Sequence, residues 1–367
     1  MADFNGDGNI DAVVPNAAGN SLALYLGGGD GTFLGAPLYA TNGDAVSIAL
    51  GDVNGDGATD VFTADGLGTV WVYLGRGKGL LSSPVGITIG GVYTSAIALG
   101  DLNNDGNLDL VVSNNAFATF SIAFGNGDGT FGSPRDYATG LMLASAITIG
   151  DFNDDNNKDL AVAGYDSVAI FLGLGDGTLQ PGPKYYVGGN PMWITSGDFN
   201  RHGALDLAIS NSQVSILLGR GDGTFRGPKQ YHVQFAGQLI SVDLNHDSIL
   251  DLVVTNLNSL ATLFGVGDGT FLPGKSLSAP ASEVAAFDAD GDGNIDLAFT
   301  MTEGLGVSIG NGDGTFQKPL NFLGGNYPNL LAVTDVDGDG KPDVVVTGAS
   351  GMAGGGQSLT TLMNTTQ

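Results

Sequence analysis

The sequence predicts an all-β protein, a β-propeller built from four-stranded antiparallel blades. A nine-residue aspartate-rich pattern recurs eight times, at intervals of 45 to 50 residues. Each repeat contains short runs of β-branched and aromatic residues bounded by Gly, Asn and Asp, which is typical of strands. No segment shows the 3.6-residue periodicity of a helix. Because a unit of this length cannot support a core alone, we expect the units to stack radially.

The repeat has two markers. The first is Asp-x-Asn/Asp-x-Asp-Gly-x-x-Asp, and its eight copies, numbered here as loops one to eight, start at Asp3, Asp52, Asp101, Asp151, Asp198, Asp243, Asp288 and Asp335. The second is Gly-x-Gly-Asp-Gly-Thr-Phe, somewhat more than twenty residues later, as at 125–131 and 219–225. Its Asp-Gly pair favours a tight hairpin.

The second repeat shows the expected strands most clearly, at 46–50, 60–64, 70–74 and about 85–89. The fourth strand opens with proline in most repeats, at Pro37, Pro84, Pro134, Pro183, Pro228 and Pro319. Because proline has no N–H to donate to a neighbouring strand, it belongs on a sheet edge. We therefore expect the fourth strand at the outside of each blade and the small, apolar first strand at the inside.

We interpret residues 1–367 as one propeller domain with eight repeats. Only Met1 and Ala2 precede the first loop, so the first repeat lacks its first strand, and the last repeat lacks its fourth. Six complete units and two three-stranded ones predict eight blades. Seven blades are the alternative, but they would leave the apolar segments 10–14 and 22–26 unplaced.

The composition favours a cation-binding protein. The net charge is −26, and 36 of the 38 acidic residues are Asp, the exceptions being Glu283 and Glu303. Such a surface repels nucleic acid and anionic membranes. The absence of cysteine excludes disulfides and thiolate chemistry. No apolar run is long enough to span a membrane, and no signal peptide is visible, as in a mature fragment.

The nine-residue loop itself predicts calcium sites. Side-chain oxygens at positions 1, 3, 5 and 9 converge, glycine at position 6 permits a sharp turn, and position 7 offers a backbone carbonyl. This set of hard oxygen ligands selects calcium over magnesium or zinc. An EF-hand is rejected, because strands flank the loops and position 12 carries no Glu. A single copy is also compatible with an ion-free turn, but eight copies gather carboxylates that repel one another without a cation.

The candidate ligands share these loop positions. They are Asp3, Asn5, Asp7, Asn9, Asp11, Asp52, Asn54, Asp56, Ala58, Asp60, Asp101, Asn103, Asp105, Asn107, Asp109, Asp151, Asn153, Asp155, Asn157, Asp159, Asp198, Asn200, Asp206, Asp243, Asn245, Asp247, Ile249, Asp251, Asp288, Asp290, Asp292, Asn294, Asp296, Asp335, Asp337, Asp339, Lys341 and Asp343. Up to eight calcium ions are expected.

The copies differ in quality. Loop four carries Asn156 at position 6, which tolerates a left-handed backbone, and loop six carries Ser248 there, followed by Ile249. Loop five has His202 in place of a carboxylate and Arg201 beside it. Fewer ligands and an added positive charge predict that loop five is weak or empty.

Loops such as 52–60, followed by a strand and the Gly-x-Gly-Asp-Gly-Thr-Phe hairpin, resemble FG-GAP/VCBS repeats, including those of the integrin α-subunit propeller. The resemblance covers essentially the whole chain. It implies calcium on one face of a propeller and an extracellular or cell-surface location. It also implies roles in adhesion or glycan binding, or as an accessory or catalytic propeller of a secreted polysaccharide lyase.

Function is expected on the other face, where the connections vary between repeats. Candidate ligand-contacting aromatics are Tyr93, Trp193 and Tyr327, although such rings can also fill gaps between blades. The three histidines, two of them inside metal loops, and the two distant glutamates offer no catalytic cluster. We therefore expect a scaffold that binds a glycan or an extracellular protein, and not an enzyme.

Overall fold

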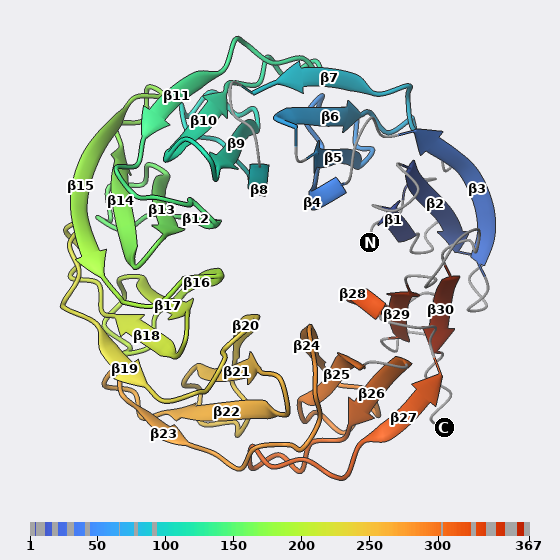
Figure 1. Ribbon diagram of the computed structural model, residues 1–367, viewed down its shortest axis with the longest axis vertical. Helices are drawn as coiled ribbons and strands as arrows, with labels where there is room; N and C mark the ends of the chain where they lie inside the picture. Colours follow the sequence, from blue (N-terminus) through green and yellow to red (C-terminus); the bar gives the residue numbers. More distant parts are fainter. Residues whose placement is uncertain are drawn as a thin grey trace.

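The computed structural model describes residues 4, 12–16, 21–27, 33–40, 45–65, 67–76, 80–89, 94–301, 304–323, 328–334, 343–348 and 358–362. In these residues all regular elements are β-strands, and each sheet is antiparallel with strands in sequence order. The sheets are arranged radially around a central axis (Figure 1). This confirms the predicted all-β propeller.

Six sheets are complete four-stranded blades. Their innermost strands are β4 (Ala45–Gly51), β8 (Thr94–Gly100), β12 (Ala146–Gly150), β16 (Trp193–Gly197), β20 (Leu239–Val242) and β24 (Val284–Phe287). Their second strands are β5 (Asp60–Asp65), β9 (Asp109–Asn114), β13 (Asp159–Gly164), β17 (Asp206–Ser210), β21 (Asp251–Thr255) and β25 (Asp296–Met301).

The other two strands of each blade complete the sheet toward the rim. The third strands are β6 (Thr69–Tyr73), β10 (Thr119–Ala123), β14 (Ser167–Gly173), β18 (Val214–Leu217), β22 (Leu260–Gly265) and β26 (Gly304–Ser308). The outer strands are β7 (Val85–Thr88), β11 (Arg135–Ala138), β15 (Leu179–Tyr186), β19 (Lys229–Tyr231), β23 (Phe271–Pro273) and β27 (Leu320–Leu323). The proline-marked strands therefore lie at the outer rim, as predicted (Figure 1).

The blade count corrects our expectation of eight, and also the alternative of seven, because the four-stranded blades number six. The first repeat forms a three-stranded sheet of β1 (Ala12–Asn16), β2 (Ser21–Gly27) and β3 (Phe33–Ala40). The last forms a three-stranded sheet of β28 (Pro328–Thr334), β29 (Asp343–Gly348) and β30 (Ser358–Leu362). Among the described residues, the first repeat has no innermost strand and the last has no outer strand, so each contributes three strands and not a complete blade.

The core lies between neighbouring blades. Strands β5, β9 and β13 are buried at every position, because both of their faces pack against adjacent sheets. One apolar cluster, for example, joins Ile170 of β14 to Leu207 and Ile209 of β17. Burial on two sides explains why the second strands read as continuous apolar runs without alternation.

The phenylalanine that ends the hairpin marker also joins neighbouring blades. Phe225, from the hairpin of the β16–β19 blade, packs edge-to-face against Phe152 and Tyr185 of the preceding blade, with ring centroids 5.7 Å apart in both pairs. The Phe225 N–H donates to the Tyr185 hydroxyl at 2.7 Å. Phe271 repeats this arrangement one blade later with Phe199 and Tyr231. The marker is thus an inter-blade contact as well as a turn.

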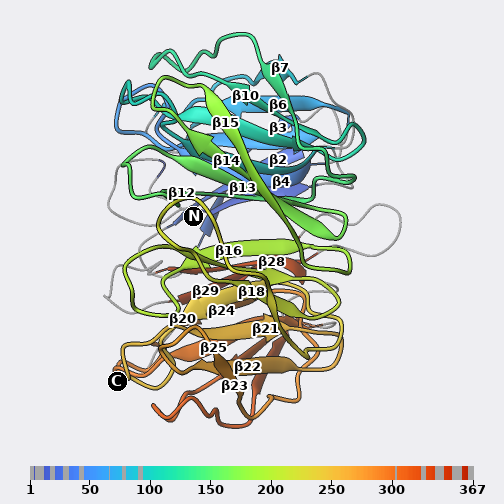
Figure 2. The same cartoon turned by 90° about the vertical axis from the view of Figure 1, so that its left-hand side faces the viewer.

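The connections lie on two opposite faces of the ring (Figure 2). The nine-residue loops join first to second strands, and the Asp-Gly hairpins join third to outer strands, so both lie on one face. We call this the aspartate face. The second-to-third turns and the links between blades form the opposite face.

Candidate metal centres

The aspartate at position 9 is buried and fastens each loop to its hairpin. Asp60, Asp109, Asp159, Asp206, Asp251 and Asp296 are all 0% exposed. One carboxylate oxygen of each accepts the N–H of the residue at position 2, at 2.7 to 2.9 Å. The other accepts the N–H of the first hairpin glycine, at 2.6 to 2.9 Å. Position 9 is therefore a structural residue as well as a candidate ligand.

The carboxylates at positions 1 and 5 are held by the backbone of their own loop. In loop two, Asp52 accepts the N–H groups of Gly55 at 2.8 Å and Gly57 at 2.9 Å. Asp56 accepts the N–H of Ala58 at 2.8 Å. Because each carboxylate oxygen has two acceptor sites, these bonds leave capacity for a cation. The loop is thus closed before any ion binds.

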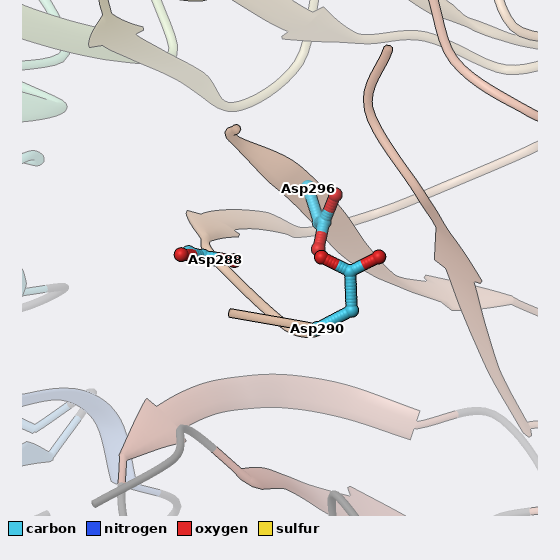
Figure 3. A group of neighbouring side chains, drawn as sticks. All are labelled: Asp288, Asp290 and Asp296. Atoms are coloured by element: carbon cyan, nitrogen blue, oxygen red, sulfur yellow. The ribbon is translucent and has the colours of Figure 1, made fainter. Parts of the chain in front are cut away.

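Among the described loops, loop seven gathers three carboxylates around one point. One oxygen each of Asp288, Asp290 and Asp296 lies within 4.8 Å of the others. Figure 3 shows Asp290 and Asp296 directed at each other, with Asp288 beside them. Such a group of hard oxygen atoms suits calcium. It also matches the sequence, since loop seven has an aspartate at each of positions 1, 3, 5 and 9.

Two positions in each described loop adopt a left-handed backbone. Position 6 was expected to do so, and φ there is 82° at Gly57, 67° at Asn156 and 63° at Ser248. Position 4 was missed. Its φ is 69° at Gly55 and 77° at Gly291, but also 56°, 58°, 61° and 62° at Asn104, Asp154, Arg201 and His246. The signal was present, because most copies have Gly, Asn or Asp there.

Position 2 was also missed as a structural position. Its side chain is buried in each described copy, for example 1% exposed at Phe152 and 0% at Phe199. The signal in the sequence is an apolar residue directly after the first aspartate of each loop. This side chain anchors the loop in the core beneath it, while the candidate ligands at positions 1, 3 and 5 stay near the surface.

The electrostatic setting makes a bare loop unfavourable. Burial raises the pKa of Asp159 and Asp251 to about 6. The two backbone N–H donors of each carboxylate lower the pKa and so offset part of this rise, whereas the carboxylates at positions 5 and 1 raise the pKa further. By contrast, the backbone N–H of position 7 lowers the pKa of the exposed Asp105 and Asp292. A cation would stabilise the ionised form of a buried carboxylate that lies beside two further carboxylates.

Loop five has an imidazole bridge at position 5, where the other described loops carry a candidate carboxylate ligand. The His202 Nε2 lies 2.9 Å from the carbonyl oxygen of Gly219, and the N–H of Ala204 donates to Nδ1 at 3.3 Å. The ring therefore links the loop to its hairpin and accepts the position 7 N–H that an aspartate accepts elsewhere. Nδ1 also lies 3.7 Å from the Asp198 carboxylate. The loop keeps its shape with one oxygen ligand fewer.

Loops four and six keep the hydrogen bonds of the intact copies despite their substitutions. The N–H of Asn156 donates to Asp151 at 2.7 Å, and that of Ser248 donates to Asp243 at 2.8 Å.

Adjacent loops also contact each other through hydrogen bonds between their side chains. The Asn104 side-chain amide donates to the Asn157 Oδ1 at 2.7 Å, and the His246 Nε2 lies 3.0 Å from the Asn294 Oδ1. Position 4 of one loop thus contacts position 7 of the next.

The remaining predicted residues fall outside this description. Asp3, Asn5, Asp7, Asn9 and Asp11 of loop one lie outside the described residues, as do Asp335, Asp337, Asp339 and Lys341 of loop eight. Asp343 is described only as the first residue of β29. Carbonyl coordination at position 7 stays a prediction.

Of the three candidate aromatics on the opposite face, only Trp193 is described, and Tyr93 and Tyr327 lie outside the described residues. Trp193 begins β16 and is 43% exposed. In the described residues, no helix is long and apolar enough to cross a bilayer.

Fold and loops together define a β-propeller protein with an aspartate-loop repeat. The model of the FG-GAP-like repeat matches residues 3–63, 52–112, 101–162, 151–209, 243–299 and 288–346. The chain therefore belongs to the FG-GAP-like repeat family. The six matches begin at loops one to four, six and seven. No match begins at loop five, the copy with His202.

Solved structures share the fold at low identity. An Agrocybe aegerita lectin, described as recognising non-reducing terminal N-acetylglucosamine, is 18% identical, with a TM-score of 0.61 over 86% of this chain and 91% of that chain. The periplasmic gluconolactonase of Pseudomonas aeruginosa is 16% identical, with a TM-score of 0.58 over 85% and 95%. A functionally unknown Desulfotomaculum acetoxidans protein is 14% identical, with a TM-score of 0.58 over 92% and 98%. A search of curated proteins gave no match.

Proposed function

We propose that this protein is a calcium-stabilised extracellular propeller that presents its opposite face as a binding surface for a glycan or a protein. The observation that carries the metal proposal is the group of carboxylate oxygens of Asp288, Asp290 and Asp296 within 4.8 Å of one another. Equivalent oxygens in the described loops two and three are held in place by backbone N–H groups. Calcium would neutralise each group and link the innermost strand to the second strand.

An extracellular or cell-surface location follows from this proposal. Extracellular modules bind calcium with dissociation constants of about 0.1 to 1 mM, which suits sites built from a few side chains and a carbonyl. Binding only to the native state would then stabilise it by about 0.4 to 1.4 kcal/mol per site at roughly 1 mM calcium. Several sites together would supply a large part of the stability of the protein.

The test is thermal unfolding of the full chain after chelation and after addition of calcium, with elemental analysis of the washed protein. We expect several calcium ions per chain, a clear rise in melting temperature with calcium, and a smaller rise with magnesium. Magnesium demands a more rigid octahedral site. An unchanged melting curve and no bound calcium would refute the metal proposal.

The choice between scaffold and enzyme rests on the polar groups available. Among the described histidines, His202 and His246 lie in loops of the aspartate face, and both already contact other loop or hairpin groups. The lectin and gluconolactonase similarities support the shared fold alone. We propose a non-catalytic role. Incubation with acidic polysaccharides, followed at the absorbance of unsaturated products, tests the alternative of a polysaccharide lyase.

A further inference from the structure

A hollow of about 410 Å³ opens where the β16–β19, β20–β23 and β24–β27 blades meet on the opposite face. Its walls come from connections of all three blades. They include Asn190 and Met192 before β16, Phe235 before β20, and Ser282 before β24. The volume lies within the range of roughly 300 to 1,000 Å³ found for small-ligand pockets.

Large apolar side chains surround this hollow and face solvent. Met192 is 60% exposed, Phe235 60% and Leu257 65%. Apolar side chains stabilise a folded protein when they are buried. These three are mostly exposed, so they contribute little to the stability of the fold. Their gathering around one hollow from three separate connections indicates a surface that a ligand covers.

Phe235 is the least expected of these residues. Its φ is 56°, a left-handed conformation that is unfavourable for a bulky side chain. The fold does not need this ring, because Val233 and Ala236, on either side of it in the same connection, are the residues buried in the core. Packing therefore does not offset the cost of this conformation, which favours a contact between the Phe235 ring and a ligand.

The rim is polar but uncharged. None of the residues that line the hollow is Asp, Glu, Lys or Arg, although the chain carries a net charge of −26. Asn190, Ser212 and Ser282 add an amide and two hydroxyls. Two further amides hold the walls in place. Asn211 donates to the carbonyl oxygens of Val187 and Gly188, and Asn256 accepts the N–H of Ser259 at 2.7 Å.

We propose that this hollow binds an uncharged sugar residue, with the apolar face of the sugar ring stacked on Phe235 and its hydroxyls bonded to the amide and hydroxyl rim. This inference rests on the proposed binding function of the opposite face and names its ligand class. A sugar presents both an apolar C–H face and neutral hydrogen-bonding edges, as this site requires. An extended peptide instead needs a long groove or a strand edge for its backbone.

The test compares two aromatic positions on the same face. Phe235→Asn removes the ring but suits the left-handed turn, so we expect no loss of folding stability. Phe117→Asn is the matched control, because Phe117 is 58% exposed on the β9–β10 turn and does not line the hollow. Both variants and the parent chain are screened in calcium against a panel of uncharged and acidic glycans, and their affinities are measured by calorimetry.

We expect uncharged glycans to bind the parent chain and Phe235→Asn to weaken that binding about tenfold or more. A third variant, Phe235→Tyr, keeps an aromatic ring at this position and should bind as the parent does. Phe117→Asn should bind as the parent does. Equal binding by Phe235→Asn, or binding confined to acidic glycans or to peptides, would overturn the sugar site while leaving the scaffold proposal intact. A parent chain that binds none of the uncharged glycans also overturns it. The calcium melting experiment is independent of each of these outcomes.

Discussion

The buried aspartates at position 9 each accept two backbone N–H groups, so they stabilise the fold before any ion binds. In loop four, Asp159 accepts the N–H groups of Phe152 and Gly173, both at 2.7 Å. An asparagine can accept only one of them, because its NH₂ group would face the other donor. The substitution therefore separates the structural role of the carboxylate from a general loss of charge.

We expect Asp159→Asn to lower the free energy of unfolding by about 1 to 3 kcal/mol in chelator, the cost of a buried unsatisfied donor. Urea unfolding measures this. The matched control is Asp154→Asn in the same loop, which removes the same charge from an exposed left-handed position that asparagine tolerates. Equal stability losses in the two variants would show that charge, and not the buried hydrogen bonds, is responsible.

A second single-residue prediction concerns loop five. His202→Asp restores the carboxylate at position 5 and removes the bridge to Gly219, so we expect one additional calcium ion per chain or one site of higher affinity. Calcium titration calorimetry of both proteins gives the number of sites. A parent loop five that already holds calcium as tightly as loop two would contradict the prediction that this site is weak or empty.

The hairpin marker acts at the level of the blade. Phe225 is 2% exposed between two blades, and its backbone N–H is bonded to Tyr185 of the preceding blade. Its contacts therefore contribute to the stacking of the sheets and not only to the turn that carries it.

We expect Phe225→Ala to destabilise the fold by about 3 to 5 kcal/mol, the usual cost of removing a buried phenylalanine. Chemical unfolding is again the measurement. The exposed Phe117→Ala should change stability by less than about 0.5 kcal/mol. If both alanine variants lose the same stability, the inter-blade interpretation of the marker is wrong.

For the ring as a whole, the division into two faces predicts where ligands bind. The aspartate face is constrained by coordination and turn geometry, whereas the connections on the opposite face differ between repeats. We expect Trp193→Ala to weaken ligand binding about tenfold, because the half-exposed indole directly follows Met192, which lines the hollow. Asp128→Ala, in a hairpin of the aspartate face, should leave affinity unchanged. The reverse result would place the ligand on the aspartate face.

The sequence alone was sufficient for the repeat and for the order of the strands within each blade. Strands expected at 46–50 and 60–64 are β4 and β5, and the proline-marked strands lie at the rim. These features are local. They depend on side-chain alternation, on the missing N–H of proline and on left-handed turns, all of which a short segment encodes.

Only the tertiary structure showed the contacts that join repeats. The packing of Phe225 against the preceding blade and the joining of Met192, Phe235 and Leu257 around one hollow require the ring to be assembled. The bond from position 9 to the hairpin of the same repeat requires at least the blade to be folded. The six complete four-stranded units were expected from the sequence, whereas the expectation that the two three-stranded repeats also count as blades was wrong. Periodicity specifies each unit, whereas a site between units depends on how the curvature of the ring brings their variable connections together.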